Sequence, residues 1–371
     1  MKAYFPKLDK LRFFAFLIVF ISHTFFFLFD VQQSDSAWLK TYGSKVFGNG
    51  EVGVHIFFTL SGFLIMFLAL KELKKTQDFS IRSFFKRRIL RIWPLYFIVL
   101  SVGFIVSKIP SVAESCYSKF WYFLGNVCAA ENITITGIET STIVPLWSIS
   151  VEEQFYVLFP FLFMYGVWTM RKGFLFRRAM LAIVSCVLLV FSLSLRYINA
   201  ENWLYISYAT VSVLPSLLIG MLFALFINKE HSALIRLVFK KSKASFGVGI
   251  LLFLLSLYIK YQGSLGISLY ILPLCVSTCI FISLAIKDRQ HVDRFENHKE
   301  KLTVYLGKIS YGLYVYHMFM ILLVNKIFDS MAGSMTDMAL VAVKAITVLI
   351  LTIGISHISY KYVEKWFLSF K

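Results

Sequence analysis

The chain has 371 residues, of which 58% are hydrophobic, 18% aromatic and only 16% charged, and its mean hydropathy is +0.73. A water-soluble protein of this length has too few polar side chains here to cover its surface, so the composition excludes a soluble enzyme and predicts an integral membrane protein. The net charge of +18 would suit a nucleic-acid partner, but it also suits a membrane protein with Lys and Arg in its cytoplasmic loops.

Ten apolar stretches are each long enough for a helix that crosses the roughly 30 Å hydrocarbon core of a bilayer. In chain order they cover residues 10–29, 51–70, 89–108, 143–166, 178–196, 204–227, 244–260, 266–286, 302–326 and 338–360. A backbone in lipid must satisfy its own hydrogen bonds, which favours helices. The expected fold is an all-α bundle of about ten transmembrane helices, with residues 1–371 forming one membrane domain.

The positions of the basic residues predict the orientation. With the N-terminus in the cytoplasm, the segments on that side contain 29 of the 38 Lys and Arg residues. This asymmetry is the positive-inside pattern, and it places both termini in the cytoplasm. It also argues against a nucleic-acid partner, because the charge is spread over several loops at one membrane face. The expected location is a cell membrane, that of a bacterium (the inner membrane) in our interpretation, with the lipid bilayer as a partner.

The first stretch contains Arg12 and His23. They are eleven residues apart, which is about 16 Å along a helix. With Arg12 at the inner interface, His23 lies near the middle of the bilayer, where ionisable groups are costly and often functional. Histidine can take up and return a proton near neutral pH. The alternative is a buried histidine that bonds to a neighbouring helix.

No small-residue cleavage site follows this stretch, so we expect a retained helix rather than a signal peptide.

The second stretch begins with Glu51 and His55, which are one helical turn apart at its outer end. Both are predicted to face an acceptor substrate that approaches from the outer side of the membrane. Ser61 and Gly62 follow, and their small side chains are typical of close helix packing.

The loop before the third stretch is strongly basic and contains Arg88 and Arg91. Three residues apart, they share one helix face. Paired guanidinium groups bind phosphate in a forked geometry, so a cytoplasmic donor that carries phosphates is predicted to dock here. The alternative is an ordinary positive flank of a membrane span.

The fourth stretch contains two adjacent carboxylates, Glu152 and Glu153, and Ser148 lies one turn before Glu152. Counted from Ile143, Glu152 lies about 14 Å below the outer face, which predicts the same depth as His23. A catalytic pair is therefore predicted, with His23 as base and Glu152 as its orienting partner. The alternative is a structural polar network between helices.

The remaining polar residues of these spans are assigned to the acceptor. The ninth stretch contains His317 within a tyrosine-rich segment, which either binds sugar or packs against its neighbours. The predicted acceptor site consists of Glu51, His55, Trp147, Ser148, Glu153 and His317.

The five cysteines show no spacing typical of a metal site, and no metal is expected. Cys116 and Cys128 share one predicted external loop, but a disulfide between them is the less favoured interpretation.

Six motifs in order resemble the acyltransferase-3 family of membrane acyltransferases, over nearly the whole chain. They are Leu8-Asp-Lys-Leu-Arg12 followed by His23, Gly53-Val-His-Ile-Phe-Phe-Thr-Leu-Ser-Gly-Phe-Leu-Ile65, Arg88-Ile-Leu-Arg91 with Pro94 and Tyr96, Trp147-Ser-Ile-Ser-Val-Glu-Glu-Gln-Phe-Tyr156, Leu306-Gly-Lys-Ile-Ser-Tyr-Gly-Leu-Tyr314 with His317, and Tyr360-Lys-Tyr-Val-Glu364.

The resemblance implies a membrane-bound O-acyltransferase that moves an acyl group, most often acetyl, from cytoplasmic acetyl-CoA to a hydroxyl of an extracytoplasmic or lipid-linked glycan. Acetyl-CoA is then a co-substrate, and no bound cofactor is expected. Arg12, Arg88 and Arg91 would meet the coenzyme, His23 would be the catalytic histidine, and Glu152 would assist it. Some relatives carry an external hydrolase-like domain; this sequence contains none, and we expect transfer to be completed within the membrane domain.

The sequence departs from the family pattern at two positions. Lys10 stands where relatives usually have glycine, and His55 stands where an acidic residue is common, which leaves the role of that position open.

Two other functions fit a multi-spanning protein with polar residues at the midplane. One is a glycan or solute transporter without acyl chemistry, which often shows two related halves that are not visible here. The other is a polyprenyl-linked sugar transferase, which usually has acidic metal-binding loops.

Overall fold

The computed structural model describes residues 5–28, 37–107, 114–130, 142–143, 145–168, 174–227, 233–287, 298–332 and 338–370, and within these ranges it contains helices and no strand. The helices are α1 (Pro6–Leu28), α2 (Ala37–Phe47), α3 (Gly50–Thr76), α4 (Ile81–Ser107), α5 (Glu114–Trp121), α6 (Gly125–Ala130), α7 (Leu146–Trp168), α8 (Phe174–Ile198), α9 (Trp203–Tyr208), α10 (Thr210–Ile227), α11 (Ala233–Lys240), α12 (Ser242–Lys260), α13 (Gly263–Leu269), α14 (Ile271–Lys287), α15 (His298–Lys308), α16 (Ser310–Ala332), α17 (Met338–Ser359), a π-helical turn (Tyr360–Glu364) and α18 (Lys365–Leu368).

The predicted all-α membrane bundle is confirmed. Nine helical segments in the described ranges are long and apolar enough to cross a membrane. The one remaining predicted span, the fourth (143–166), corresponds to α7, which is also long enough with 23 residues. Three consecutive polar side chains, Glu152, Glu153 and Gln154, lower its hydropathy below that of the other nine.

The ninth predicted span begins earlier in the sequence than it does in the structure. Residues 298–308 form the separate helix α15, which packs against α1, and the spanning helix α16 begins at Ser310. At the crossing of α15 and α1, a Cβ on Gly307 would lie 1.7 Å from the carbonyl oxygen of Asp9. The glycine therefore brings the two backbones into direct contact.

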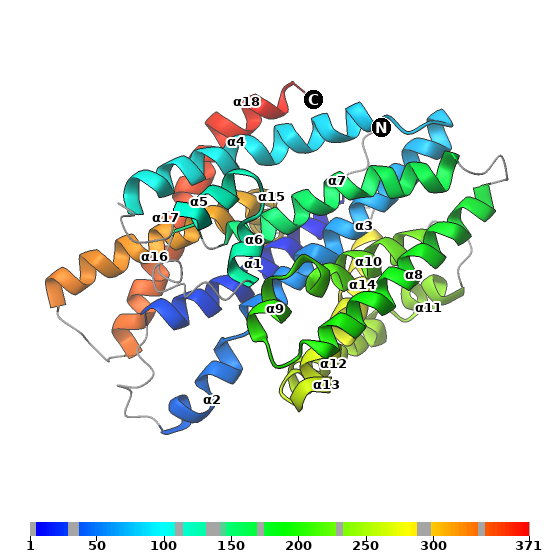
Figure 1. Ribbon diagram of the computed structural model, residues 1–371. Helices are drawn as coiled ribbons and strands as arrows, with labels where there is room; N and C mark the ends of the chain where they lie inside the picture. Colours follow the sequence, from blue (N-terminus) through cyan, green and yellow to red (C-terminus); the bar gives the residue numbers. More distant parts are fainter. Residues whose placement is uncertain are drawn as a thin grey trace.

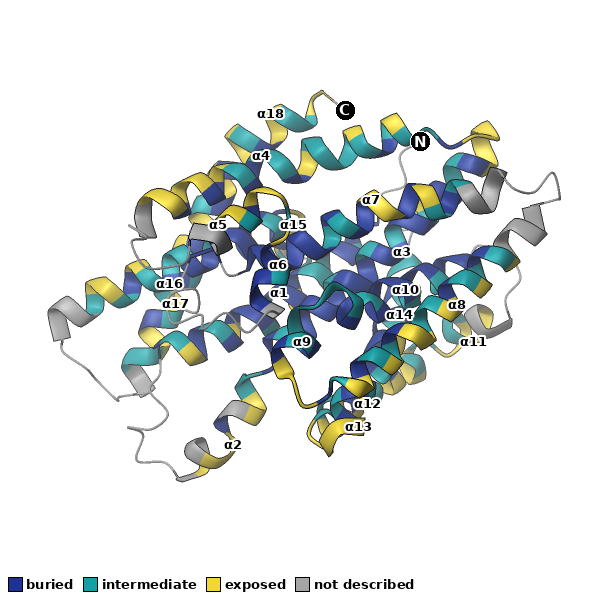
Figure 2. Cartoon of the chain, in the orientation of Figure 1, coloured by how far each residue is buried: buried dark blue, intermediate teal, exposed yellow. Residues whose placement is uncertain are grey.

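Helices α1, α3 and α10 form the middle of the bundle, and α4, α8, α12 and α17 lie outside them (Figure 1). The burial pattern follows this arrangement, because the central helices are mostly buried and the peripheral ones carry many exposed apolar residues (Figure 2). Leu251, Ile350 and Val190 are each more than 60% exposed. Large apolar side chains on the outside are what a bundle surrounded by lipid presents.

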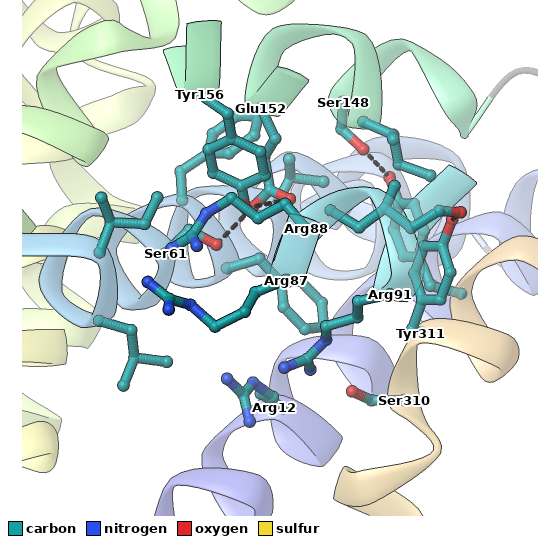
Figure 3. Close-up of a pocket in the computed structure, with 18 of the residues that line it drawn as sticks. Arg12, Ser61, Arg87, Arg88, Arg91, Ser148, Glu152, Tyr156, Ser310 and Tyr311 are labelled. Carbon is teal, nitrogen blue, oxygen red and sulfur yellow. Dashed lines mark hydrogen bonds between the residues drawn. The ribbon is translucent and has the colours of Figure 1, made fainter. Parts of the chain in front are cut away.

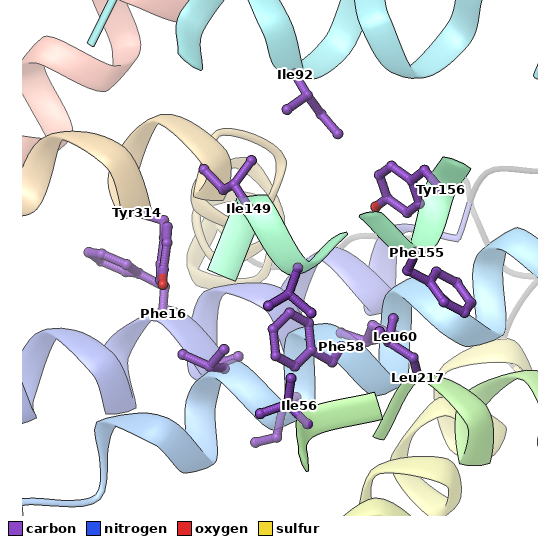
Figure 4. Packing of buried hydrophobic residues seen from close by; sticks show 14 of the residues in the cluster. Phe16, Ile56, Phe58, Leu60, Ile92, Ile149, Phe155, Tyr156, Leu217 and Tyr314 are labelled. Carbon is purple, nitrogen blue, oxygen red and sulfur yellow. The ribbon is translucent and has the colours of Figure 1, made fainter. Parts of the chain in front are cut away.

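The largest cluster of buried apolar side chains joins α1, α3, α4, α7, α10 and α16. Phe16, Phe58, Ile149 and Leu217 are among its members (Figure 4). This cluster holds the helices that carry the polar residues discussed below.

A second close helix crossing joins α3 to α10 through two glycines. A Cβ on Gly62 would lie 2.0 Å from the carbonyl oxygen of Leu217, and one on Gly220 would lie 2.1 Å from that of Thr59. Small residues at such crossings let backbones approach, and van der Waals contact then holds the helices together in lipid.

We expect Gly62→Ala to lower the thermal stability of the detergent-solubilised protein, because the added methyl must separate α3 from α10. Overpacking of this kind costs about 1–3 kcal/mol. The matched control is Gly247→Ala in α12, where a Cβ would have no atom within 4 Å. Equal melting temperatures for the two variants would contradict this account of the crossing.

One expectation about the cysteines was wrong. Cys128, in α6, is disulfide-bonded, although a disulfide in this predicted external loop was the less favoured interpretation. Cys186, Cys275 and Cys279 are free. Spacing in the sequence says nothing about which cysteines the fold brings together.

Candidate active site

A cavity of about 270 Å³ lies between α1, α3, α4, α7 and α16. Its longest wall is α3, which contributes side chains from Val54 to Leu68. These positions are fourteen residues apart, so the cavity extends about 21 Å along the helix axis.

Four arginines from two helices line this cavity: Arg12 of α1 and Arg87, Arg88 and Arg91 of α4 (Figure 3). The periodicity of α4 explains the grouping, because residues three and four apart share a face. The fold brings all three residues predicted to bind the donor, Arg12, Arg88 and Arg91, to one cavity.

The four arginines differ in their partners. Arg12 pairs with Asp9 at 2.5 Å, and Arg87 pairs with Glu72 at 2.9 Å. Within the described part of the chain, neither Arg88 nor Arg91 forms an ion pair. Arg88 instead lies over the rings of Phe84 and Tyr156, 3.8 and 5.3 Å from their centroids.

A guanidinium group that faces a partly enclosed cavity without a counter-ion makes this part of the cavity receptive to an anion. Arg91 is exposed to the cavity space, and the Nε of Arg88 is buried without a hydrogen-bond partner. Both guanidinium groups can therefore accept a phosphate as a ligand.

Glu152 lines the same cavity one turn below Ser148 on α7. It accepts hydrogen bonds from Ser61 of α3 and, at 3.1 Å, from the Tyr156 hydroxyl (Figure 3). Gly62, next to Ser61, has the packing role expected for it, but Ser61 itself faces the cavity.

The end of the cavity farther from the arginines is lined by Val54, Phe57, Phe58, Ser148 and Tyr314. The hydroxyls of Ser148 and Tyr314 are 2.8 Å apart, and both lie within 3.2 Å of the carbonyl oxygen of Pro145. The ring of Tyr314 also meets Phe57 edge to face, with centroids 5.9 Å apart. Aromatic rings and two hydroxyls thus form the end wall.

His317 lies three residues after Tyr314 on α16, one helical turn beyond this wall. It is fully buried, and its Nε2 is 2.7 Å from Nδ1 of His23 on α1. Its Nδ1 is 2.6 Å from the backbone oxygen of Tyr314. His23 is only partly buried. The two histidines, predicted for different roles, therefore form one pair that adjoins the cavity without lining it.

The predicted contact between His23 and Glu152 is wrong. Ser22, the residue before His23, packs against Gly50 of α3, whereas Glu152 bonds to Ser61 of the same helix. His23 and Glu152 therefore lie at levels of α3 that are eleven residues apart. This separation is about 16 Å along the helix axis. The depth estimate failed because packing against other helices sets the depth of each helix and decides which helix lies beside it. Counting residues along one helix cannot show either.

Glu51 and His55 do not line the cavity either. Glu51 forms an ion pair with Lys260 at 3.0 Å and accepts a hydrogen bond from Tyr270 at 2.7 Å. His55 is buried and bonds to Ser216 at 2.8 Å. These contacts tie α3 to α10, to α12 and to the junction between α13 and α14.

Trp147 and Glu153 point away from the cavity. Trp147 packs edge to face on Phe58 and on Tyr208. Glu153 accepts a hydrogen bond from Trp93 at 3.0 Å. Of the six residues predicted for the acceptor, Ser148 alone lines this cavity.

Residues 5–360 match a family model described as an acyltransferase domain. The chain belongs to the acyltransferase-3 family.

Two relatives come from Staphylococcus aureus. The O-acetyltransferase OatA of strain NCTC 8325 is 28% identical over 380 residues, which cover 97% of this chain and 57% of the relative. A further protein of strain COL, also named as an O-acetyltransferase, is 26% identical over 387 residues with the same coverage. The chain thus spans a little over half the length of these curated relatives. No solved structure matches it.

Several cavity residues were not predicted from the sequence. Arg87, Ser61, Tyr156, Tyr311 and Tyr314 all line the cavity. Tyr156 was within reach of sequence reasoning, since it follows Glu152 by four residues on one helix face. Tyr311 and Tyr314 belong to the tyrosine-rich segment, but only the packing of α16 against α7 shows that they face this cavity.

Proposed function

We propose that this protein transfers an acetyl group from acetyl-CoA, bound at the arginine side of the cavity, to a hydroxyl of a glycan on the other side of the membrane. The observation that carries the proposal is a cavity with two unpaired arginines that leads to a hydroxyl-lined wall next to a histidine pair. Family membership and the O-acetyltransferase names of the relatives support the same chemistry.

The dimensions fit the donor. Arg12 and His23 are eleven residues apart in the continuous helix α1, a distance of about 16 Å. A pantetheine arm has about 13 bonds between its phosphorus and its sulfur, and an extended chain advances about 3.5 Å per three bonds, so the arm reaches about 15 Å. Phosphates held by Arg12, Arg88 and Arg91 would therefore let the arm reach the end wall of the cavity that adjoins the histidine pair.

The cavity volume also favours the arm over the whole coenzyme. About 270 Å³ lies below the range typical of pockets that enclose a complete drug-sized ligand. We assign the space to the narrow pantetheine arm, with the nucleotide outside it. Glu152 then lies beside the arm, where its carboxylate can accept an amide N–H, in place of the rejected role as partner of His23.

The reaction is a single acyl transfer in this proposal. The glycan oxygen attacks the thioester carbonyl carbon as His23 takes the hydroxyl proton, the carbon–sulfur bond breaks, and the coenzyme sulfur receives the proton from His23. Hydrogen-bond donors aimed at the carbonyl oxygen would stabilise its developing negative charge. The hydroxyls of Ser148 and Tyr314 at the cavity end are the nearest candidates. A short-lived acyl-enzyme on the way is compatible with the same residues.

Two observations support the direction of transfer. The distribution of the basic residues favours a cytoplasmic location for the arginine side. The disulfide at Cys128 lies in a segment that this orientation puts outside, where disulfides persist. With relatives in S. aureus, we place the protein in a bacterial cell membrane.

The test uses purified protein in liposomes with acetyl-CoA labelled in the acetyl group. The acceptor is envelope glycan that has been treated with mild base to remove existing esters, and it is enclosed inside the vesicles. We expect coenzyme thiol to be released outside and an alkali-labile label to appear on the enclosed glycan. A transporter without acyl chemistry would release no thiol and form no ester, and that result would overturn the proposal.

A further inference from the structure

The hydrogen bonds of the histidine pair have a fixed direction. The Nδ1 of His317 contacts the backbone oxygen of Tyr314 at 2.6 Å, and a carbonyl oxygen can only accept. The Nδ1 of His317 must therefore carry its proton. In a neutral imidazole the other nitrogen then has a lone pair, so Nε2 of His317 is an acceptor.

The contact with His23 follows from this polarity. Nε2 of His317 accepts, so the proton between the rings, across 2.7 Å, belongs to Nδ1 of His23. The second nitrogen of His23, Nε2, is then left with a free lone pair. That nitrogen is the atom that can take a proton from an attacking hydroxyl.

The ring geometry is that of a hydrogen bond and not of stacking. The planes of the two rings are 5° from parallel, and their centroids are 5.0 Å apart. Stacked rings keep their atoms about 3.5 Å apart or more. A nitrogen–nitrogen distance of 2.7 Å therefore means that the rings meet edge to edge in nearly one plane.

The surroundings of the pair hold His317 in place. Its ring is fully buried, and Phe16 meets it edge to face with centroids 5.9 Å apart. Neither histidine has a hydrogen bond or ion pair to a carboxylate within the described part of the chain. The backbone oxygen of Tyr314 thus takes the place of the acidic group that orients the histidine in many hydrolases.

We propose that His317 is a positioning residue that holds His23 in the tautomer with its lone pair on Nε2. This inference rests on the proposed function, in which His23 is the base. His317 itself exchanges no proton in the reaction. It accepts the His23 hydrogen bond, which becomes stronger while His23 carries the proton of the acceptor hydroxyl.

Substitutions of His317 separate this role from simple packing. His317→Leu fills the buried space with an apolar group but removes the acceptor, and we expect kcat to fall about 10²-fold, within the range of general-base contributions. His317→Gln keeps a side-chain oxygen near the position of Nε2, and we expect it to recover kcat to within about tenfold of wild type. The KM for acetyl-CoA should stay unchanged in both, since His317 does not line the donor cavity.

A structural role predicts the opposite order, because leucine suits a buried apolar site better than glutamine does. Higher activity of His317→Leu than of His317→Gln would therefore overturn the inference. So would an equal change in KM and kcat.

A second measurement does not depend on activity. Nitrogen-15 NMR of histidine-labelled protein in bilayers distinguishes protonated from unprotonated ring nitrogens, and comparison with His23→Asn and His317→Gln assigns the two rings. We expect Nδ1 of His23 to be protonated and Nε2 unprotonated in the wild type. A protonated Nε2 on His23 would refute the inference even if acetyl transfer occurs. The expected tautomer in a protein that transfers no acetyl group would instead refute the proposed function.

Discussion

Replacing His23 with alanine is expected to lower the kcat of acetyl transfer by about 10²–10⁴-fold, the usual contribution of a general base. The affinity for acetyl-CoA should change little, because His23 does not line the cavity that would hold the donor. The measurement is transfer of labelled acetyl from acetyl-CoA to base-treated envelope glycan, together with equilibrium binding of coenzyme A to the same preparation.

The matched control is His357→Ala. His357 is an exposed histidine of α17 whose ring bonds to Tyr305 at 2.6 Å, away from the cavity. This variant should keep its transfer activity. If His23→Ala transfers acetyl at the wild-type rate while remaining folded, His23 is not the base, and the assignment of the reaction to this end of the cavity fails.

Removing the two unpaired arginines, in the double variant Arg88→Ala and Arg91→Ala, is expected to raise the KM for acetyl-CoA about 10²-fold or more. A hydrogen bond to a charged group contributes about 1.5–3 kcal/mol, and each arginine would contribute at least one. The kcat at saturating donor should change much less, since neither side chain reaches the histidine pair.

Arg82→Ala with Lys86→Ala provides the control for net charge. Both side chains are exposed on α4, and neither lines the cavity. The control removes the same two charges from the same helix, so a general loss of electrostatic attraction would affect both double variants alike. An equal rise of KM in the two would reject a specific phosphate site.

Donor truncation tests the same contacts from the ligand side. Acetyl-pantetheine lacks the nucleotide phosphates, so wild type should lose affinity for it relative to acetyl-CoA, whereas the Arg88/Arg91 variant should show little further loss. This double-mutant logic isolates the pairwise interaction between arginines and phosphates. Additive losses in the variant would place the phosphates elsewhere.

The sequence predicted the helical spans well because their signal is strong and local. A helix that crosses lipid must be about 20 apolar residues long, and this requirement leaves little freedom of interpretation. The prediction of spans was weaker where polar residues interrupt a span, as in α7, and where one apolar run divides into two helices, as at α15 and α16.

The candidate site was predicted in part. Arg88 and Arg91 share a helix face by their spacing, and Glu152 with Tyr156 does so too, so their common orientation follows from the helical period alone. The pairing of His23 with His317 did not follow, because these residues are 294 positions apart and belong to α1 and α16.

The sequence by itself determined that this chain is a helical membrane protein, that its basic residues gather in alternate loops, and that its motifs are those of the acyltransferase-3 family. Only the tertiary structure decided which polar side chains meet, that His23 contacts His317 instead of Glu152, and that Glu51 and His55 bond to neighbouring helices. The physical reason is that composition and period are properties of one segment at a time. The depth and the neighbours of a helix depend on how side chains such as Gly50, Gly62 and Gly220 allow backbones to approach.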